Sequence, residues 1–210
     1  MDRRSCQTLA PLRMAESAFV VFVPEAESLV QDLRQEHDPS ALAGIAAHVT
    51  VLFPFMEPST LTPSVLAACQ AVLAAHATFA FTLGSVGRFP STAYLEPSPP
   101  EPFVSLTHAL WAEFPSYPPF AGEFASVVPH LTVSHGSAQA ALSVAEQLAS
   151  RLQRVGPIAA RCRSVSLVEN SSGSWRRTHE FQLAPEPGSP QAEFVVRHHL
   201  VAAAQPVIDA

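Results

Sequence analysis

The sequence predicts an α+β fold of two similar, pseudo-symmetric lobes, each built from antiparallel sheet with flanking helices. Two apolar stretches with the same chemistry, 48–53 (HVTVLF) and 129–134 (PHLTVS), occur in the two halves of the chain. Each half also has the same order of elements: a helix, one of these stretches as a strand, a helix and two more strands. The closing strand pairs, within 79–96 and 158–183, have turn-length connections, which antiparallel hairpins use and parallel strands cannot.

In the first half, the elements follow from apolar spacing and from boundary residues. Residues 25–37 place apolar side chains at helical spacing, with carboxylates in the first turn, where the helix dipole favours them. Thr62 and Pro63 are residue types that cap and open a helix. The predicted order is a strand, a helix, a His-Thr strand, a helix and a hairpin, at residues 18–23, 25–37, 48–53, 62–75 and 79–96.

A proline-rich linker at 97–102 separates this half from the second, because consecutive prolines forbid regular structure. Gly156 and Pro157 then end a long helix. Trp175 and Phe181 fall on one face of the last strand. The predicted order is a helix, a His-Thr strand, a helix and two strands, at residues 102–114, 129–134, 137–155, 158–168 and 174–183.

Length and composition bound the class of protein. The 210 residues predict one bilobal domain at 16–184, a disordered or artefactual extension at 1–15 and a tail at 185–210. The formal net charge of −6 argues against long duplex nucleic acid as a partner. No apolar run approaches the roughly 18 residues of a membrane span and no signal peptide is recognisable, so we expect a cytoplasmic protein with no membrane partner.

Each of the two repeated strands offers an imidazole and a hydroxyl side by side. Side chains alternate across a strand, so His48 shares a face with Thr50, and His130 with Thr132. In-line displacement at phosphorus needs a base for the attacking oxygen and an acid for the leaving oxygen, and histidine titrates near neutral pH. Threonine hydroxyls can hold the non-bridging oxygens. The simpler alternative is two core histidines, each bonded to a neighbouring backbone group.

The motifs HVTV (48–51) and HLTV (130–133) resemble the two signature motifs of the 2H phosphoesterases, in particular the bacterial 2′-5′ RNA ligase-like branch. The resemblance covers about residues 17–184. It implies a bilobal fold with a central cleft and activity on 2′,3′-cyclic phosphates or 2′-5′ linkages. By similarity, the acid–base pair is His48 and His130, and the phosphate-binding hydroxyls belong to Thr50 and Thr132.

Weaker candidates surround these pairs. Trp175, Arg177 and His179 alternate on one face of the last strand, where an arginine could neutralise phosphate and a tryptophan could stack on a base. Tyr94 could stack on a base as well. His135 stands where relatives of the resembled family often have arginine, and on a regular strand it faces away from the first histidine of its motif. The structural alternatives are core aromatics, a strand-edge arginine and a solvated histidine.

Together, the residues and the resemblance predict a metal-independent phosphoesterase that opens 2′,3′-cyclic phosphates of nucleotides or RNA ends, or acts on 2′-5′ linkages. We expect no cofactor and no metal, because no histidines, cysteines or acids have ligand spacing. The expected partner is a small nucleotide or an RNA end with a cyclic phosphate, and the expected state is a monomer. Two alternatives stay open: a 2′-5′ RNA ligase using the reverse reaction, and a non-catalytic module that binds nucleotides or RNA ends.

Overall fold

The computed structural model of the protein describes residues 15–186, so residues 1–14 of the expected extension and residues 187–210 of the expected tail lie outside it. The described strands are β1 (Ser17–Phe22), β2 (His48–Leu52), β3 (Phe79–Phe89), β4 (Thr92–Ser98), β5 (Leu131–His135), β6 (Ile158–Cys162), β7 (Ser164–Glu169) and β8 (Arg176–Gln182). The α-helices are α1 (Glu27–His37), α2 (Pro39–Leu42), α3 (Pro63–Ala74), α4 (Glu101–Glu113) and α5 (Ala138–Val155). Short 3-10 helices lie at Pro24–Ala26, Pro58–Thr60 and Pro119–Gly122.

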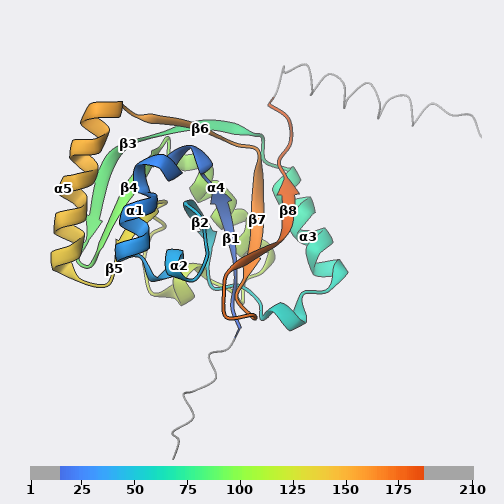
Figure 1. Ribbon diagram of the computed structural model, residues 1–210. Helices are drawn as coiled ribbons and strands as arrows, with labels where there is room; N and C mark the ends of the chain where they lie inside the picture. Colours follow the sequence, from blue (N-terminus) through green and yellow to red (C-terminus); the bar gives the residue numbers. More distant parts are fainter. Residues whose placement is uncertain (1–14, 187–210) are drawn as a thin grey trace, which may run out of the picture.

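The strands form two four-stranded antiparallel sheets, which confirms the predicted fold class. One, the β1 sheet, has the order β2-β1-β7-β8, and the other, the β4 sheet, has the order β5-β4-β3-β6. Figure 1 shows the β4 sheet on the left and the β1 sheet on the right. The edge strands β2 and β5 contact each other, so the two His-Thr strands meet where the sheets meet.

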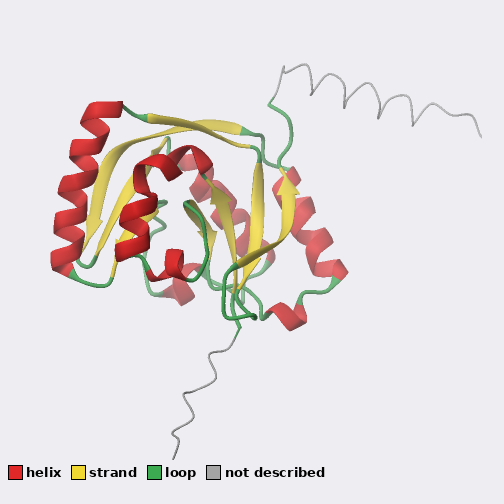
Figure 2. Cartoon of the chain, in the orientation of Figure 1, coloured by secondary structure: helices red, strands yellow, loops and turns green. Residues whose placement is uncertain are grey.

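Two helices cover each sheet. In each pair, one helix directly follows a strand of the opposite sheet in the chain. Helices α3 and α4 pack on the β1 sheet, against β8 and β2, while α1 and α5 pack on the β4 sheet. Helix α1 nevertheless follows β1, and α4 follows β4. The helices therefore lie on the outside of a two-sheet centre, as Figure 2 shows for α5 and α3 at opposite ends of the view.

Helix boundaries agree with the local signals in the sequence. The Thr62 hydroxyl accepts a hydrogen bond from the Val65 amide at 3.3 Å, and the Ser137 hydroxyl accepts one from the Ala140 amide at 3.1 Å. Gly156 ends α5 with a φ of +79°, a conformation that favours glycine. In the part of the chain that the structure describes, no helix is long and apolar enough to cross a membrane.

Two boundaries differ from the expectation. Strand β4 continues through Pro97 to Ser98, so the predicted linker at 97–102 shrinks to Pro99 and Pro100 between β4 and α4. The strand predicted at 158–168 is divided at Arg163, because β6 pairs with β3 while β7 pairs with β1 and β8. Each sheet thus takes two strands from each half of the chain.

One large hydrophobic core joins the two sheets. Phe103 of α4 is fully buried, and its ring lies 5.0 Å from the rings of Phe79 and Phe81 on β3, edge to face. Because α4 also packs on β2, Phe103 connects the β4 sheet to the β1 sheet. Fully burying a ring of this size contributes about 1.5–3 kcal/mol of transfer free energy.

Candidate active site

His48 and Thr50 point to the face of the β1 sheet that is turned away from the main core, which we call the open face. Both side chains are half-buried, whereas Val49 and Val51 between and beyond them are buried in the core. His130 and Thr132 of the second motif have the same burial, with Leu131 in the core. The predicted alternation therefore holds in both motifs. The face of the β4 sheet that carries His130 and Thr132 is part of the same open face, because the edge strands β2 and β5 contact each other.

Both His-Thr strands have the same β-bulge directly after the threonine. On β2, Thr50 pairs with Val20 and Leu52 with Phe19, so Val51 is the extra residue. On β5, Thr132 pairs with Tyr94 and Ser134 with Ala93, so the extra residue is the next valine, Val133. A bulge shifts the alternation of the residues that follow it.

This bulge overturns the expected orientation of His135. On a regular strand His135 would face away from His130, but its register partner is Thr92, which shares a face with Tyr94 and therefore with Thr132. Its Nδ1 lies 3.0 Å from the Thr92 hydroxyl. His135 is also close enough that its charge lowers the pKa of His130. His135 thus lies on the open face. The alternation of the sequence predicted that it would lie on the opposite face.

The two motif histidines make the same backbone hydrogen bond. His48 Nδ1 donates to the carbonyl of Ala46 and His130 Nδ1 to the carbonyl of Val128, each at 2.8 Å and each two residues upstream. Because a carbonyl oxygen only accepts, Nδ1 carries the hydrogen in both rings. Nε2 is then the nitrogen that can exchange a proton, and no residue within 15–186 makes a hydrogen bond to it in either ring.

The surroundings of His48 favour its neutral form. Burial lowers the pKa of His48 to about 4, since desolvation penalises the charged imidazole, and the positive charge of Arg34 acts in the same direction. The hydrogen bond to Ala46 and the charge of Asp38 oppose this shift. The charge of His130 lowers the pKa of His48 further, so the two rings lie within electrostatic reach of each other.

His130 lies among aromatic rings. Its ring centroid is 5.2 Å from Phe89, 5.1 Å from Tyr94 and 6.5 Å from Phe120. Burial lowers the pKa of His130 from its ordinary value, against the opposite effect of its hydrogen bond to Val128. Among residues 15–186, the aromatic ring that lies near His48 is that of Phe22, at 6.4 Å. The two sites are equivalent in backbone and differ in what surrounds each ring.

Sequence reasoning missed Phe120, because it comes from an irregular loop with no periodic signal. Phe120 and Ala121 adopt left-handed conformations, with φ of 50° and 54°, which cost on the order of 1–3 kcal/mol each in residues other than glycine. The Phe120 amide donates to the carbonyl of Phe53 at 2.6 Å, which holds this turn in place. The ring then stacks on His130 at an interplanar angle of 20°.

Tyr94 supports His130 instead of offering a surface to a base. The residue is 5% exposed, and its ring lies 4.5 Å from Phe89 as well as close to His130. Room for the ring comes from Gly87, its register partner on β3. An added Cβ at this glycine would overlap the Tyr94 ring and approach a carboxylate oxygen of Glu96 at 2.6 Å.

We expect Gly87→Ala to disturb the site through Tyr94. Overpacking of this kind destabilises a protein by about 1–3 kcal/mol, and here it also displaces the ring that packs on His130. Thermal unfolding measures the first effect and the shift of the His130 ring resonances in NMR measures the second. Gly84→Ala is the matched control, because the three atoms nearest to its added Cβ all belong to Pro157, the first at 3.1 Å, and none to Tyr94. Equal effects of the two substitutions would contradict the specific role of Gly87.

A third bulge separates Trp175 and Arg177 from His179. Val168 pairs with Arg177 and Leu167 with His179, so Thr178 is the extra residue on β8. Arg177 accordingly lies over the Phe22 ring on the open face, at 5.9 Å, while His179 stacks on Phe181 of the main core. The expectations that His179 shares a face with Arg177, and Trp175 with Phe181, are therefore wrong.

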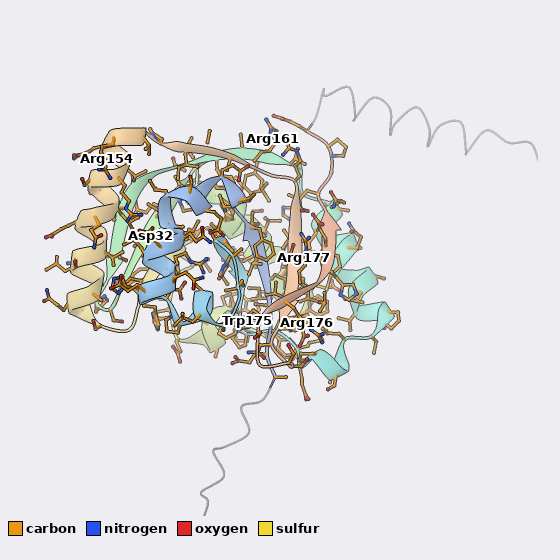
Figure 3. All side chains as sticks on the ribbon, in the orientation of Figure 1. Asp32, Arg154, Arg161, Trp175, Arg176 and Arg177 are labelled. Carbon is orange, nitrogen blue, oxygen red and sulfur yellow. The ribbon has the colours of Figure 1, made fainter. Side chains whose placement is uncertain are left out.

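Trp175 packs beside the open face of the β1 sheet. Its ring lies 6.3 Å from that of Phe53, and its amide donates to the carbonyl of Ala43 at 2.8 Å. Figure 3 shows Trp175, Arg176 and Arg177 together at the start of β8. Of the two arginines, Arg176 donates a hydrogen bond to the buried carboxylate of Glu169. The ion pair of Arg177 is the looser one, with the exposed Glu180 at 3.5 Å.

Other reactive groups of the described chain are elsewhere. Burial raises the pKa of the Cys69 and Cys162 thiols to about 12, so both are inert at neutral pH. Among residues 15–186, no three His, Cys, Asp or Glu side chains gather as a metal site would require. The candidate site therefore consists of the Nε2 atoms of His48 and His130, which can exchange protons, and of the hydroxyls of Thr50 and Thr132 on the same surface.

Solved structures with the same fold support a relationship at the level of architecture. A crystal structure of a phosphoesterase matches with a TM-score of 0.53 and 16% identity, over 82% of this chain and 99% of that one. TT0787 of Thermus thermophilus matches with a TM-score of 0.53 and 18% identity, over 81% and 99%. LigT of E. coli in complex with 3′-AMP matches with a TM-score of 0.50 and 16% identity, over 82% and 99%.

Sequence comparison gives the family directly. No curated protein sequence matches the chain significantly. The model of the 2′-5′ RNA ligase superfamily matches residues 22–174, a range that contains both His-Thr strands. The chain therefore belongs to the 2′-5′ RNA ligase superfamily of 2H phosphoesterases.

Proposed function

We propose that the protein opens 2′,3′-cyclic phosphates of nucleotides or RNA ends by acid–base catalysis between His48 and His130, without a metal. The observation that carries this proposal is the shared geometry of the two rings: both donate Nδ1–H to a carbonyl two residues upstream, which leaves two Nε2 atoms for proton transfer. Water would attack phosphorus as one histidine removes its proton, and the bond to the ribose 2′ or 3′ oxygen would break as the other protonates that oxygen.

The electrostatics support His48 as the base and His130 as the acid. A pKa near 4 keeps His48 neutral and able to accept a proton throughout the neutral range. His130 must begin protonated, and a bound phosphate anion favours that form because opposite charges nearby stabilise the imidazolium. The Thr50 and Thr132 hydroxyls would hold the non-bridging oxygens between the two rings.

The activity is tested by incubating the purified protein, with EDTA, with 2′,3′-cyclic nucleotides, with an oligonucleotide ending in a cyclic phosphate and with a 2′-5′-linked dinucleotide. Opening of a cyclic phosphate to a single monophosphate product supports the proposal. Turnover that is lost with EDTA and recovered with a divalent ion would contradict the metal-independent mechanism.

Two other functions would use the same residues. A 2′-5′ RNA ligase would run the reverse step on a cyclic end and a 5′ hydroxyl, and joined product in the same assay would identify it. A binding module would hold the ligand unchanged. Two titrating histidines favour catalysis, because a simple phosphate binder is better served by arginine or a helix N-terminus. The E. coli LigT structures with 3′-AMP and NADP⁺ show that such relatives bind small nucleotides.

We expect Thr50→Ala and Thr132→Ala each to lower turnover by up to about tenfold, because each removes one neutral hydrogen bond to the phosphate, worth about 0.5–1.5 kcal/mol. The conservative change to serine keeps the hydroxyl and should retain most of the activity. Steady-state kinetics with a cyclic nucleotide measures both. A Thr→Ala variant as slow as a variant lacking a histidine would instead give the threonine a part in proton transfer.

The pH dependence of kcat/KM should be bell-shaped and lie on the acid side of neutrality. His48 loses activity as a base only when protonated, so the acid limb should fall near pH 4. His130 works only when protonated, and its lowered pKa puts the alkaline limb of the free enzyme below the ordinary histidine value of 6.5. Bound phosphate should move the alkaline limb of kcat to higher pH. An acid limb at pH 6 or above would contradict the assignment of His48.

A further inference from the structure

A hollow of about 430 Å³ opens on the β1 sheet next to His48, and we call it the β8 hollow. Its apolar lining includes aromatic rings, and its rim includes charged groups. The lining includes Phe22, Ile45, Ala46, Val168, Trp175 and Arg177. The volume is in the range that small-molecule sites occupy.

Two contacts connect the hollow to the candidate active site. Phe22 is the register partner of His48, and the edge of one ring faces the other at 6.4 Å. Ala46, which also lines the hollow, provides the carbonyl that accepts His48 Nδ1–H. A ligand with one part in the hollow would therefore place its next group at His48.

The lining has the chemistry of a nucleoside site. Trp175 is half-buried and gives a flat apolar surface on which a base can stack. The guanidinium of Arg177 stands over the Phe22 ring at 5.9 Å, and its contact with Glu180 at 3.5 Å joins two exposed side chains. A solvent-exposed pair of this kind is weak, so a phosphate can compete for the arginine.

We propose that the β8 hollow is the subsite for the nucleoside that carries the reacting phosphate, with the base on Trp175 and the phosphate held by Arg177. This assignment rests on the proposed function, which it extends by fixing the direction in which the substrate lies. The nucleobase then lies on the β1 sheet, and the ribose carries the phosphate from the hollow to the two histidines.

The test compares Trp175→Ala and Arg177→Ala with matched controls, Trp111→Ala and Arg154→Ala, which remove the same residue types at exposed positions outside the hollow. Figure 3 shows Arg154 at the far end of the molecule, on α5. Calorimetric titration with adenosine 3′-monophosphate measures binding, and steady-state kinetics with adenosine 2′,3′-cyclic phosphate measures turnover.

For Trp175→Ala we expect the dissociation constant to rise 5-fold to 100-fold, because stacking of one base contributes about 1–3 kcal/mol. KM should rise by a similar factor, with little change in kcat. Arg177→Ala should weaken binding by about tenfold or more, since it removes a charge-assisted contact to phosphate. The two control variants should bind as the unaltered protein does.

Binding and turnover separate this proposal from the proposed function. If the protein binds the nucleotide and only the Trp175 and Arg177 variants lose affinity, the subsite is supported even where no cyclic phosphate is opened. If the unaltered protein does not bind the nucleotide, or if the variants and controls behave alike, the subsite assignment is wrong, whatever the turnover assay gives.

A second, independent observation concerns the turn that leads into β2. The guanidinium of Arg34 donates to the carbonyl of Ile45 at 3.1 Å and binds Asp38 through Nε at 3.1 Å and Nη2 at 2.9 Å. Asp38 in turn accepts from the amide and hydroxyl of Ser40. Arg34 and Asp38 are each only 2% exposed.

Ala47, at the end of the same turn, is held through both its amide and its carbonyl. The Ala47 amide donates to the Glu27 carboxylate at 2.5 Å, and the Ala47 carbonyl accepts from the Val23 amide at 2.8 Å. The Ala46 carbonyl accepts His48 Nδ1–H. A buried ion pair adds little stability by itself, so its presence behind this turn requires another reason.

We further propose that Arg34 and Asp38 are positioning residues for the reaction, which hold the turn at 45–47 and through it the ring orientation and charge state of His48. The groups that face His48 are Arg34 and Asp38 from α1 and its end, and His130 from the other sheet. Glu27 accepts from the Ala47 amide, and Arg177 stands over Phe22, the register partner of His48.

The test uses charge changes with opposite expected signs. Asp38→Asn removes the negative charge and should move the acid limb of kcat/KM to lower pH, while Arg34→Met removes the positive charge and should move it to higher pH. Arg34→Lys keeps the charge without the fork of donors, so kcat should fall while the limb stays in place. NMR titration of the His48 ring gives the same comparison without turnover and is therefore independent of the proposed function.

Arg34→Met leaves a buried carboxylate unpaired, and this variant can fail to fold. In that case Asp38→Asn and Arg34→Lys decide the question. Limbs and ring titrations that stay unchanged in the folded variants, or that move in the same direction for both charge changes, would show that the pair is purely structural.

Discussion

Replacing His48 or His130 with alanine is expected to lower turnover of a 2′,3′-cyclic nucleotide by about 10²–10⁴-fold, because each variant loses one proton-transfer group. The double variant should be little slower than either single one, since acid and base act as a unit. Single-turnover kinetics with adenosine 2′,3′-cyclic phosphate measures all three. Neither substitution removes a large core side chain, so the fold should persist.

The control is His108→Ala, which removes an exposed histidine of α4 that has no part in the proposed mechanism. Its turnover should equal that of the unaltered protein. A folded His48→Ala or His130→Ala variant with nearly full turnover would transfer the function to the binding-module alternative.

The largest loss of stability is expected from Phe103→Ala. Removing a fully buried phenylalanine costs about 3–5 kcal/mol, and Phe103 packs edge to face on both Phe79 and Phe81 at 5.0 Å. Because this ring joins the two sheets, we expect both to unfold together. Chemical denaturation followed by far-ultraviolet circular dichroism and by the fluorescence of Trp111 and Trp175 should give one midpoint.

The control for this substitution is Leu142→Ala on α5, where the side chain is 42% exposed. A surface change of this kind should stay within about 0.5 kcal/mol. Two separate midpoints in the Phe103→Ala protein would show that the sheets are independent folding units, against the shared core seen in the structure.

Much of the architecture could be predicted because it is written in local signals. Apolar spacing and capping residues such as Thr62 and Ser137 fix the four longer helices within one or two residues, whereas the short helix α2 was not predicted. Alternation fixes the common face of His48 and Thr50. These features depend only on neighbours in the chain, so one sequence is enough to find them.

The errors occur where one extra residue alters the alternation. A bulge at Val133 turns His135 to the open face, and a bulge at Thr178 turns His179 away from Arg177. A bulge has no fixed sequence signature, because the valine or threonine it contains is an ordinary strand residue. The partner strand decides where the ladder slips, and that partner is distant in sequence.

Charged and irregular segments were also beyond reach. Arg34 and Asp38 have the i, i+4 spacing of an ordinary surface pair on a helix, and only the packing of α1 shows that they are buried. Phe120 lies in a loop whose path depends on a contact with Phe53, far earlier in the chain. The placement of these side chains follows from tertiary contacts, so no local sequence pattern predicts it.

The crossing of α1 and α4 has a consequence for how such a site can arise. Strands β1, β2 and β3 lie at the second, first and third places of their sheets, and β4, β5 and β7 lie at the same places with the two sheets exchanged. Two copies of a unit running from β1 to β3 would place three strands in each sheet around a two-fold axis, and their two motif histidines would be equivalent. The single chain keeps this axis between β2 and β5. It also frees each copy to diverge, as the charged pair behind His48 and the aromatic rings around His130 show.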